Sequence, residues 1–220
     1  GPPEGWHPDP ESLYEQGGGP MFDLGVYILT ALVALLGPAK HVVGAARTSN
    51  PVRTVLKGPR SGAPFRVSTP THVAGTVAFH SGAVATVTTS FDVHGDHEFH
   101  LTVHGTDGAL RIPDPSEYGE LYGEEELGPV MLWRRGASDW EEVPFTHGYW
   151  RKTHGLGLAD MVHAILSGRA HRANDDLGFH VLEMMQAFLD SAREGRRMEI
   201  SSSCKRPAPM PEGLADGKLD

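Results

Sequence analysis

The spacing of apolar residues divides the chain into a helical beginning, a long β-rich middle and a helical end. Apolar residues run almost without a break over 26–36, and a Gly-Pro pair follows them. Because glycine and proline end helices, this pattern predicts one buried helix over 20–36. A shorter helix is expected over 9–16, with Asp9 as its N-cap and a run of glycines at its end.

Between residues 41 and 145 apolar and polar residues alternate with a period of two, which predicts strands. The segments 73–80 and 83–91 flank a Ser-Gly pair, and Gly82 can adopt the positive φ that a two-residue hairpin loop needs. Further strands are expected over 99–103, 109–112, 131–134 and 140–143.

Two more helices are expected over 158–166 and 176–194, because apolar residues recur there at helical spacing and a glycine follows each segment. This order, in which antiparallel strands follow one group of helices and precede another, is typical of an α+β fold. We expect a large, mostly antiparallel open sheet with helices packed on one face. The sequence contains no βαβ unit and no glycine-rich turn between a strand and a helix, so a Rossmann domain is absent from this chain.

Charge and composition exclude several classes of partner. The net charge is −9, from 28 acidic and 19 basic residues, and no basic stripe reverses it, so neither nucleic acid nor a membrane is expected. The apolar run is too short to cross a bilayer of roughly 30 Å. A single cysteine, Cys204, cannot form an internal disulfide, which favours a cytoplasmic setting. No metal site is predicted, because the densest histidines lack the spacing of shared ligands: His94, His97, His100 and His104.

The segment 17–27 carries the most chemistry in the sequence. It begins with three glycines, which allow the backbone to approach another group closely at a helix start. Asp23 and Tyr27 are four residues apart, so on a helix they point to one side, where a carboxylate and a phenol would hold a sugar-like hydroxyl. The alternative is structural, with the acid placed for the helix dipole and the tyrosine in the core.

Short blocks of sequence accompany this segment in a characteristic order. They are Trp6-His7-Pro8-Asp9-Pro10, Leu35-Leu36-Gly37-Pro38, Pro70-Thr71-His72-Val73-Ala74-Gly75, Val103-His104-Gly105-Thr106-Asp107-Gly108, Gly157-Leu158-Ala159-Asp160-Met161, His180-Val181-Leu182-Glu183 and Arg206-Pro207-Ala208-Pro209. Together with the glycine segment they resemble the C-terminal domain of the glucose–fructose oxidoreductase/inositol dehydrogenase/MocA (Gfo/Idh/MocA) family. The resemblance runs from about Trp6 to Pro211.

The resemblance implies an NAD(P)-dependent oxidoreductase that transfers hydride at a carbinol or carbonyl carbon of a sugar or polyol. A missing N-terminal Rossmann domain would bind NAD or NADP and supply a lysine, so this chain alone should be inactive. Asp23 matches the family's aspartate, and Tyr27 matches its acid/base, which is histidine in inositol dehydrogenases and tyrosine in other branches. We predict both as catalytic residues, and the tyrosine puts an inositol substrate in doubt.

A second set of residues is predicted to contact the substrate without reacting. The set comprises Trp6, His7, Gly18, Gly19, His72 and His180. The first four lie in or just before the glycine loop, and the two later histidines lie in matching blocks. For each of those two histidines a packing role is the alternative.

The resemblance also predicts the organisation of the chain. Residues 1–16 would be a linker and short helix from the missing cofactor domain, 17–204 the substrate-binding and oligomerisation domain, and 205–220 a proline-rich tail. A homodimer or homotetramer is expected through the sheet face. Two other functions fit the same residues: a stand-alone ligand-binding or oligomerisation module derived from the family, and an NAD-dependent glycosidase.

Overall fold

The computed structural model describes residues 2–94, 100–115, 128–150, 155–215 and 217–220. Within these ranges the chain packs as two compact units. Unit 1 comprises Gly1–Asp96 and Asp175–Arg206, and unit 2 comprises His97–Asn174 and Pro207–Asp220. The domain boundaries expected from the sequence remain a prediction.

Unit 1 is built on a four-stranded antiparallel sheet with the order β10-β1-β4-β5. Its strands are β1 (Ala39–Arg47), β4 (His72–Phe79), β5 (Val84–Ser90) and β10 (Met198–Glu199). A separate two-stranded ladder pairs β2 (Val52–Thr54) with β3 (Pro64–Arg66).

The hairpin of β4 and β5 confirms the alternation seen in the sequence. Its loop, however, has three residues rather than the expected two. The Phe79 carbonyl accepts from the Gly82 N–H (3.0 Å), and the Phe79 N–H donates to the Ala83 carbonyl (2.9 Å). Gly82 has a φ of +89°, so a turn followed by a left-handed glycine closes the hairpin.

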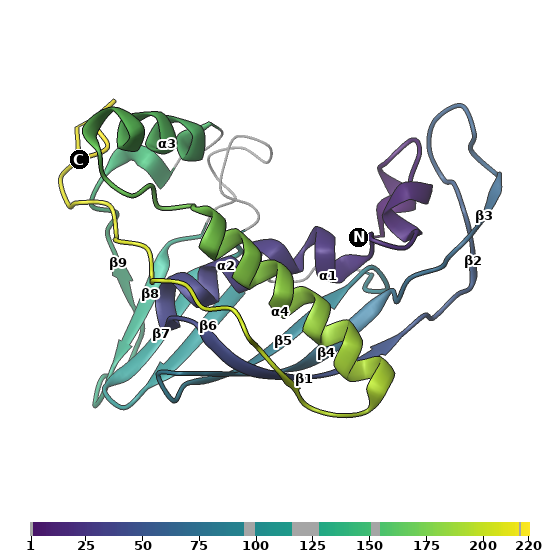
Figure 1. Ribbon diagram of the computed structural model, residues 1–220, viewed down its shortest axis with the longest axis horizontal. Helices are drawn as coiled ribbons and strands as arrows, with labels where there is room; N and C mark the ends of the chain where they lie inside the picture. Colours follow the sequence, from purple (N-terminus) through teal and green to yellow (C-terminus); the bar gives the residue numbers. More distant parts are fainter. Residues whose placement is uncertain (1, 95–99, 116–127, 151–154, 216) are drawn as a thin grey trace. The chain divides into compact units, whose positions relative to one another are not determined.

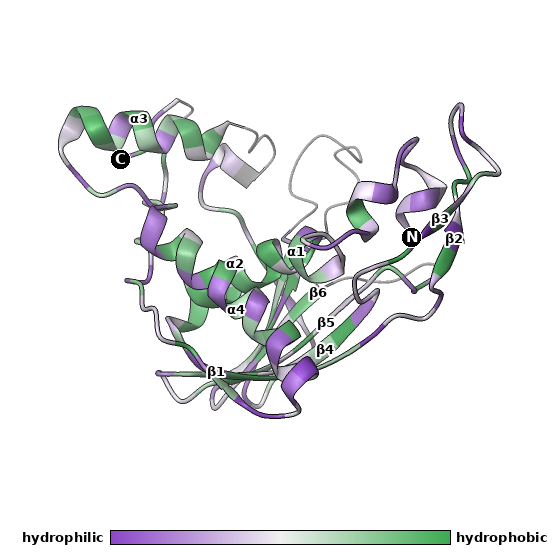
Figure 2. Cartoon of the chain, turned by 45° about the vertical axis from the view of Figure 1, so that its right-hand side comes forward, coloured by the Kyte–Doolittle hydropathy of each residue, from purple (hydrophilic) through white to green (hydrophobic). Residues whose placement is uncertain are grey.

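Three helices cover one face of the unit 1 sheet (Figure 1). They are α1 (Pro20–Asp23), α2 (Gly25–Leu36) and α4 (Asp175–Glu194). Helix α4 lies along β1 and buries the predicted apolar side, including Val181, Met184 and Phe188. Helix α2 packs against α4 and is apolar over most of its length (Figure 2).

The single helix predicted over 20–36 is wrong at one residue, because the helix is interrupted at Leu24. The Leu24 N–H donates to the Pro20 carbonyl (2.9 Å), and the Leu24 carbonyl accepts from the Tyr27 N–H (3.2 Å). Gly25 leaves room for the Met21 side chain at this point, since a Cβ there would lie 2.7 Å from the Met21 sulfur.

The short helix expected over 9–16 is reduced to one 3-10 turn, Glu11–Tyr14, after an earlier turn at Pro3–Gly5. Asp9 does not cap it, because the Asp9 carboxylate accepts from Arg60 (3.2 Å) instead.

Unit 2 has its own four-stranded antiparallel sheet, in the order β6-β7-β8-β9. Its strands are β6 (His100–Gly105), β7 (Gly108–Pro113), β8 (Val130–Arg134) and β9 (Glu141–Val143), as predicted to within a few residues. Phe99, expected to begin β6, lies outside the described residues. A 3-10 turn (Gly148–Trp150) is followed by helix α3 (Leu156–Ser167), which ends at Gly168 with a φ of +72°.

The α+β fold with helices on one sheet face is therefore confirmed. Every strand pair among the described residues is antiparallel. The single large sheet expected from the sequence is divided into three sheets in the described ranges. In those ranges no helix combines the length and apolarity needed to cross a membrane.

Candidate functional site

The glycine loop turns the chain into α1 and packs against its own backbone. Gly17 and Gly19 have φ values of +92° and +89°, which other residues rarely adopt. The Gly19 N–H donates to the Leu13 carbonyl (2.7 Å), and a Cβ on Gly18 would lie 2.7 Å from that carbonyl oxygen. The backbone packing by itself requires glycine at these positions. It therefore does not test the substrate contacts predicted for Gly18 and Gly19, which stay predictions.

Asp23 ends α1 and is half-buried. Burial raises the pKa of its carboxyl group above the usual value. Its N–H donates to the Gly19 carbonyl (3.0 Å), whereas no described residue donates a hydrogen bond to its carboxylate. A half-buried carboxylate without a partner is unfavourable for the protein alone, and such groups are often kept for a ligand.

Tyr27 lies in the first turn of α2, with 48% of its surface exposed. Its hydroxyl has no hydrogen-bond partner among the described residues. Tyr14 is the opposite case: it is fully buried, and its hydroxyl donates to Glu4. Tyr27 and Asp23 therefore offer a donor and an acceptor that the described structure does not use, on the two sides of the break at Leu24.

Trp6 and His7 follow the first 3-10 turn. Trp6 is 53% exposed and stands edge-on to the His7 ring, with 5.6 Å between the ring centroids. The Nδ1 of His7 accepts from the Asp9 N–H (3.1 Å). An exposed aromatic pair fits the predicted rim of a binding site.

The two later histidines differ from each other. His72 begins β4, half-buried, with its Nδ1 3.0 Å from the Ser90 hydroxyl oxygen. His180 is fully buried; its Nε2 accepts from the Ala39 N–H and its Nδ1 contacts the Ser202 hydroxyl, each at 2.9 Å. Burial lowers the pKa of His180, and its Nε2 carries no proton where it accepts the Ala39 N–H. Both ring nitrogens are occupied, which favours the packing alternative for this residue.

A buried ionic network lies in unit 1, and no sequence pattern pointed to it. Arg53 donates to the Glu4 carboxylate (2.8 Å) and also to Asp92. Asp92 accepts from the hydroxyls of Ser49 (2.6 Å) and Thr71 (2.7 Å). Burial opposes ionisation of Asp92, yet these hydrogen bonds and the Arg53 charge together lower its pKa. The members are far apart in sequence, so only the folded chain brings them together.

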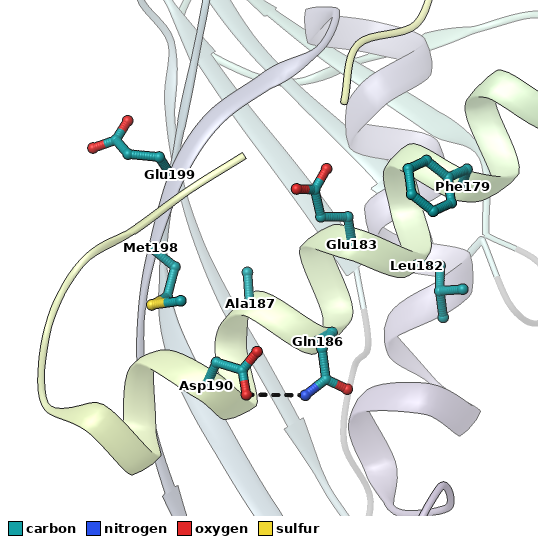
Figure 3. A pocket seen from close by; sticks show the side chains of 8 residues that line it. All are labelled: Phe179, Leu182, Glu183, Gln186, Ala187, Asp190, Met198 and Glu199. Atoms are coloured by element: carbon teal, nitrogen blue, oxygen red, sulfur yellow. Dashed lines mark hydrogen bonds between the residues drawn. The ribbon is translucent and has the colours of Figure 1, made fainter. Parts of the chain in front are cut away.

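Two cavities of similar size lie in unit 1. A polar pocket of about 380 Å³ is lined by the ionic network, including Glu4, Arg53 and Asp92. A groove of about 400 Å³ is lined by one side of α4, including Phe179, Leu182 and Glu183, and by Met198 and Glu199 of β10 (Figure 3). Neither cavity includes Asp23 or Tyr27.

The described residues bring no three metal-ligating side chains together. Of the dense histidine group, His97 lies outside the described residues. The described strands form antiparallel sheets and no parallel nucleotide-binding sheet.

Comparison with known proteins identifies a family model and a shared fold. The family model of the GFO/IDH/MocA C-terminal domain matches residues 1–111. Levoglucosan dehydrogenase in complex with NADH and L-sorbose has a TM-score of 0.71 and 19% identity, over 90% of this chain and 56% of that one. An NAD binding oxidoreductase from Klebsiella pneumoniae has a TM-score of 0.70 and 19% identity, over 90% of this chain and 57% of that one.

An aldose-aldose oxidoreductase from Caulobacter crescentus, complexed with glycerol, has a TM-score of 0.59 and 24% identity, over 83% of this chain and 48% of that one. At such identities the likeness shows a shared fold. The chain spans about half the length of these solved structures. No curated protein matches it.

Proposed function

The chain belongs to the Gfo/Idh/MocA family, and from this premise we propose that it is the substrate-binding part of an NAD(P)-dependent sugar or polyol oxidoreductase. The proposal rests on one observation above the others. Asp23 and Tyr27 flank the break at Leu24 with a carboxylate and a phenol that have no hydrogen-bond partner among the described residues. A domain kept only as a scaffold would have no need of this pair.

Tyr27 is the proposed acid/base at the reacting hydroxyl. When bound, NAD(P) supplies the hydride acceptor or donor. The Tyr27 oxygen then takes the proton from the alcohol as it becomes a carbonyl, or returns it in the reverse direction. A free tyrosine has a pKa of about 10, so a nearby positive charge is needed to make it a base at neutral pH. The family resemblance assigns that charge to a lysine of the N-terminal domain.

Asp23 is the proposed orienting group. Its ionised carboxylate accepts a hydrogen bond from a substrate hydroxyl and fixes the ring relative to Tyr27. Such a bond to a charged acceptor contributes roughly 1.5–3 kcal/mol. It also offsets the cost of a half-buried carboxylate, which is what raises the pKa of Asp23 in the free protein.

The proposed rim of the site consists of Trp6, His7, Gly18, Gly19 and His72. Trp6 offers an exposed aromatic face, which suits the apolar face of a sugar ring. His180 is not part of this proposal, because its ring is buried and fully bonded within unit 1.

The related structures support the substrate class. One carries NADH with L-sorbose, which is a sugar, and another carries glycerol, which is a polyol. We propose the same class of substrate for this protein, with NAD or NADP as the cofactor.

The proposal includes a homo-oligomer formed through the sheet of unit 1. On the face away from the helices, Val43 pairs with Thr76, which in turn pairs with Thr86, and all three are exposed. Val84 extends this exposed row, which then consists of two valines and two threonines, and is 70% exposed. A second copy of the chain would cover the row.

The test is a screen of the full-length protein against sugars and polyols with NAD and NADP, followed by the absorbance of the reduced nicotinamide. Tyr27→Phe should lower kcat by about 10²–10⁴-fold. Tyr149→Phe removes a phenolic hydroxyl in unit 2 and should leave the rate unchanged. No turnover with any substrate, or full activity of Tyr27→Phe, would overturn the proposal. Release of a free sugar from a glycoside without net reduction of the nucleotide would assign glycosidase chemistry instead.

A further inference from the structure

We propose that Arg53 is a positioning residue that clamps the segment 3–9 to the open end of the β4–β5 hairpin. The segment carries Trp6 and His7, and the hairpin carries His72, so this clamp sets the affinity for the sugar. The effect on sugar affinity rests on the proposed function, whereas the clamp rests on contacts within unit 1.

On one side, Arg53 holds the N-terminal segment through Glu4. One Nη of Arg53 donates to a carboxylate oxygen of Glu4 (2.8 Å), and the other oxygen accepts from the Tyr14 hydroxyl. The main chain adds a second tie, because the Leu56 N–H donates to the Glu4 carbonyl (3.1 Å). Glu4 precedes Trp6 by two residues, so this anchor restricts where the indole can lie.

On the other side, the second Nη of Arg53 donates to Asp92, directly after β5. The Asp92 N–H donates to the Ser90 hydroxyl oxygen (3.1 Å), which is also 3.0 Å from Nδ1 of His72. Two predicted substrate contacts, on the N-terminal segment and on β4, are therefore joined through one guanidinium.

Burial makes this connection rigid. The exposed fractions of the side chains are 6% for Arg53, 10% for Glu4 and 16% for Asp92. If one of these charged side chains rotated into solvent, its partner would stay buried without a counter-charge, which is strongly unfavourable. A lysine ammonium keeps the charge but lacks the planar fork that reaches both carboxylates.

Arg60 provides a matched comparison on the same segment. It pairs with Asp9 (3.2 Å) and Glu11 (2.5 Å), yet its side chain is 48% exposed. Exposed ion pairs contribute little, so the Arg60 pairs should not fix the position of Trp6.

The experiment uses the full-length protein with Arg53→Lys, Glu4→Gln and the control Arg60→Lys. Glu4→Gln keeps the size of the side chain and an acceptor for Arg53, so it is the variant that most readily stays folded. The KM values for the sugar and for the nucleotide, kcat, Tm, and hydrogen exchange of residues 2–16 and of α4 are measured for each protein.

Arg53→Lys and Glu4→Gln should each raise the KM for the sugar about tenfold, with the nucleotide KM and kcat within about twofold of wild type. Exchange should rise in residues 2–16 and stay unchanged in α4. Arg60→Lys should match the wild type in every measurement.

An unchanged sugar KM in a folded variant overturns the inference. It is also overturned if kcat falls and both KM values rise by similar factors, with faster exchange throughout unit 1. Either result leaves a purely structural network. If Arg53→Lys does not fold, Glu4→Gln decides. If the wild-type protein turns over no sugar, the proposed function fails; faster exchange confined to residues 2–16 then still supports the clamp, and unchanged exchange overturns it.

Discussion

At the scale of single residues, Asp23 and Tyr27 differ from Tyr14 and His180 in whether the fold uses their polar groups. Tyr14 and His180 are buried and have hydrogen-bond partners, whereas Asp23 and Tyr27 have none among the described residues. A polar group that the fold itself does not satisfy is available to a ligand. Residue type alone cannot make this distinction.

Asp23→Asn is expected to separate stability from activity. Burial raises the pKa of Asp23, so the folded state favours the protonated form and bears a cost when the group ionises above that pKa. Removing the charge should therefore leave stability at neutral pH equal or higher, while kcat/KM falls by about 10- to 100-fold. Urea unfolding and steady-state kinetics of the same preparation check both parts. A variant that is less stable and fully active would contradict the assignment.

His180 should make the protein sensitive to mild acid. Burial, aided by the nearby His80, lowers the pKa of His180, and the weaker attraction of Glu183 does not reverse this. The unfolded histidine takes up its proton near pH 6.5 while the folded one resists, so the free energy of unfolding should fall as the pH drops below about 6.5.

Urea unfolding between pH 8 and pH 5 measures this dependence. His180→Gln, whose amide oxygen can still accept from the Ala39 N–H, should lose part of the slope. His171→Gln, at an exposed position, should keep it. Identical slopes in all three proteins would count against His180 as the source.

At the scale of elements, close packing of α4 on the sheet determines where glycine is required. A Cβ on Gly75 would collide with the Val43 carbonyl oxygen and lie 2.9 Å from the Phe188 ring. The same helix approaches β1 at Gly44, where a Cβ would meet the Phe188 carbonyl. These two glycines let α4 lie directly on the backbone of β1 and β4.

Gly75→Ala should therefore lower the free energy of unfolding by about 1–3 kcal/mol or more, because backbone has to move to admit the methyl group. Gly178→Ala is the matched control on α4 itself, since nothing lies within 4 Å of a Cβ there. It should stabilise the helix by about 0.5–1 kcal/mol. Chemical denaturation measures both, and a neutral Gly75→Ala would show that the sheet and α4 are less tightly packed than described.

At the scale of the whole molecule, the exposed row of Val43, Thr76, Thr86 and Val84 on the unit 1 sheet predicts association. Val84→Asp should place a charge in that interface and shift the full-length protein toward the monomer in light scattering at micromolar concentration. Leu182→Asp, in the groove along α4, should leave the oligomer intact. Dissociation by Leu182→Asp alone would move the interface to the groove, and a monomeric wild type would refute the oligomer.

Much of the secondary structure follows from local physical rules that act over a few neighbouring residues. The β4–β5 hairpin and the ends of α3 and α4 were predictable because period, glycine position and turn geometry are properties of consecutive residues. The break at Leu24 was not, and the room that Gly25 leaves there for the Met21 side chain is seen only in the folded chain. The loop length between β4 and β5 was also missed by one residue, since it depends on the pairing register.

The sequence by itself determined the fold class and the family, because these depend on periodicity and on ordered short motifs. It also predicted Asp23 and Tyr27 as site residues, and this stays a prediction. Only the tertiary structure decided that His180 packs in the interior, that Arg53 joins Glu4 to Asp92, and which polar groups have no partner. The physical reason is that burial and hydrogen-bond satisfaction depend on residues distant in the chain, and no local pattern carries that information.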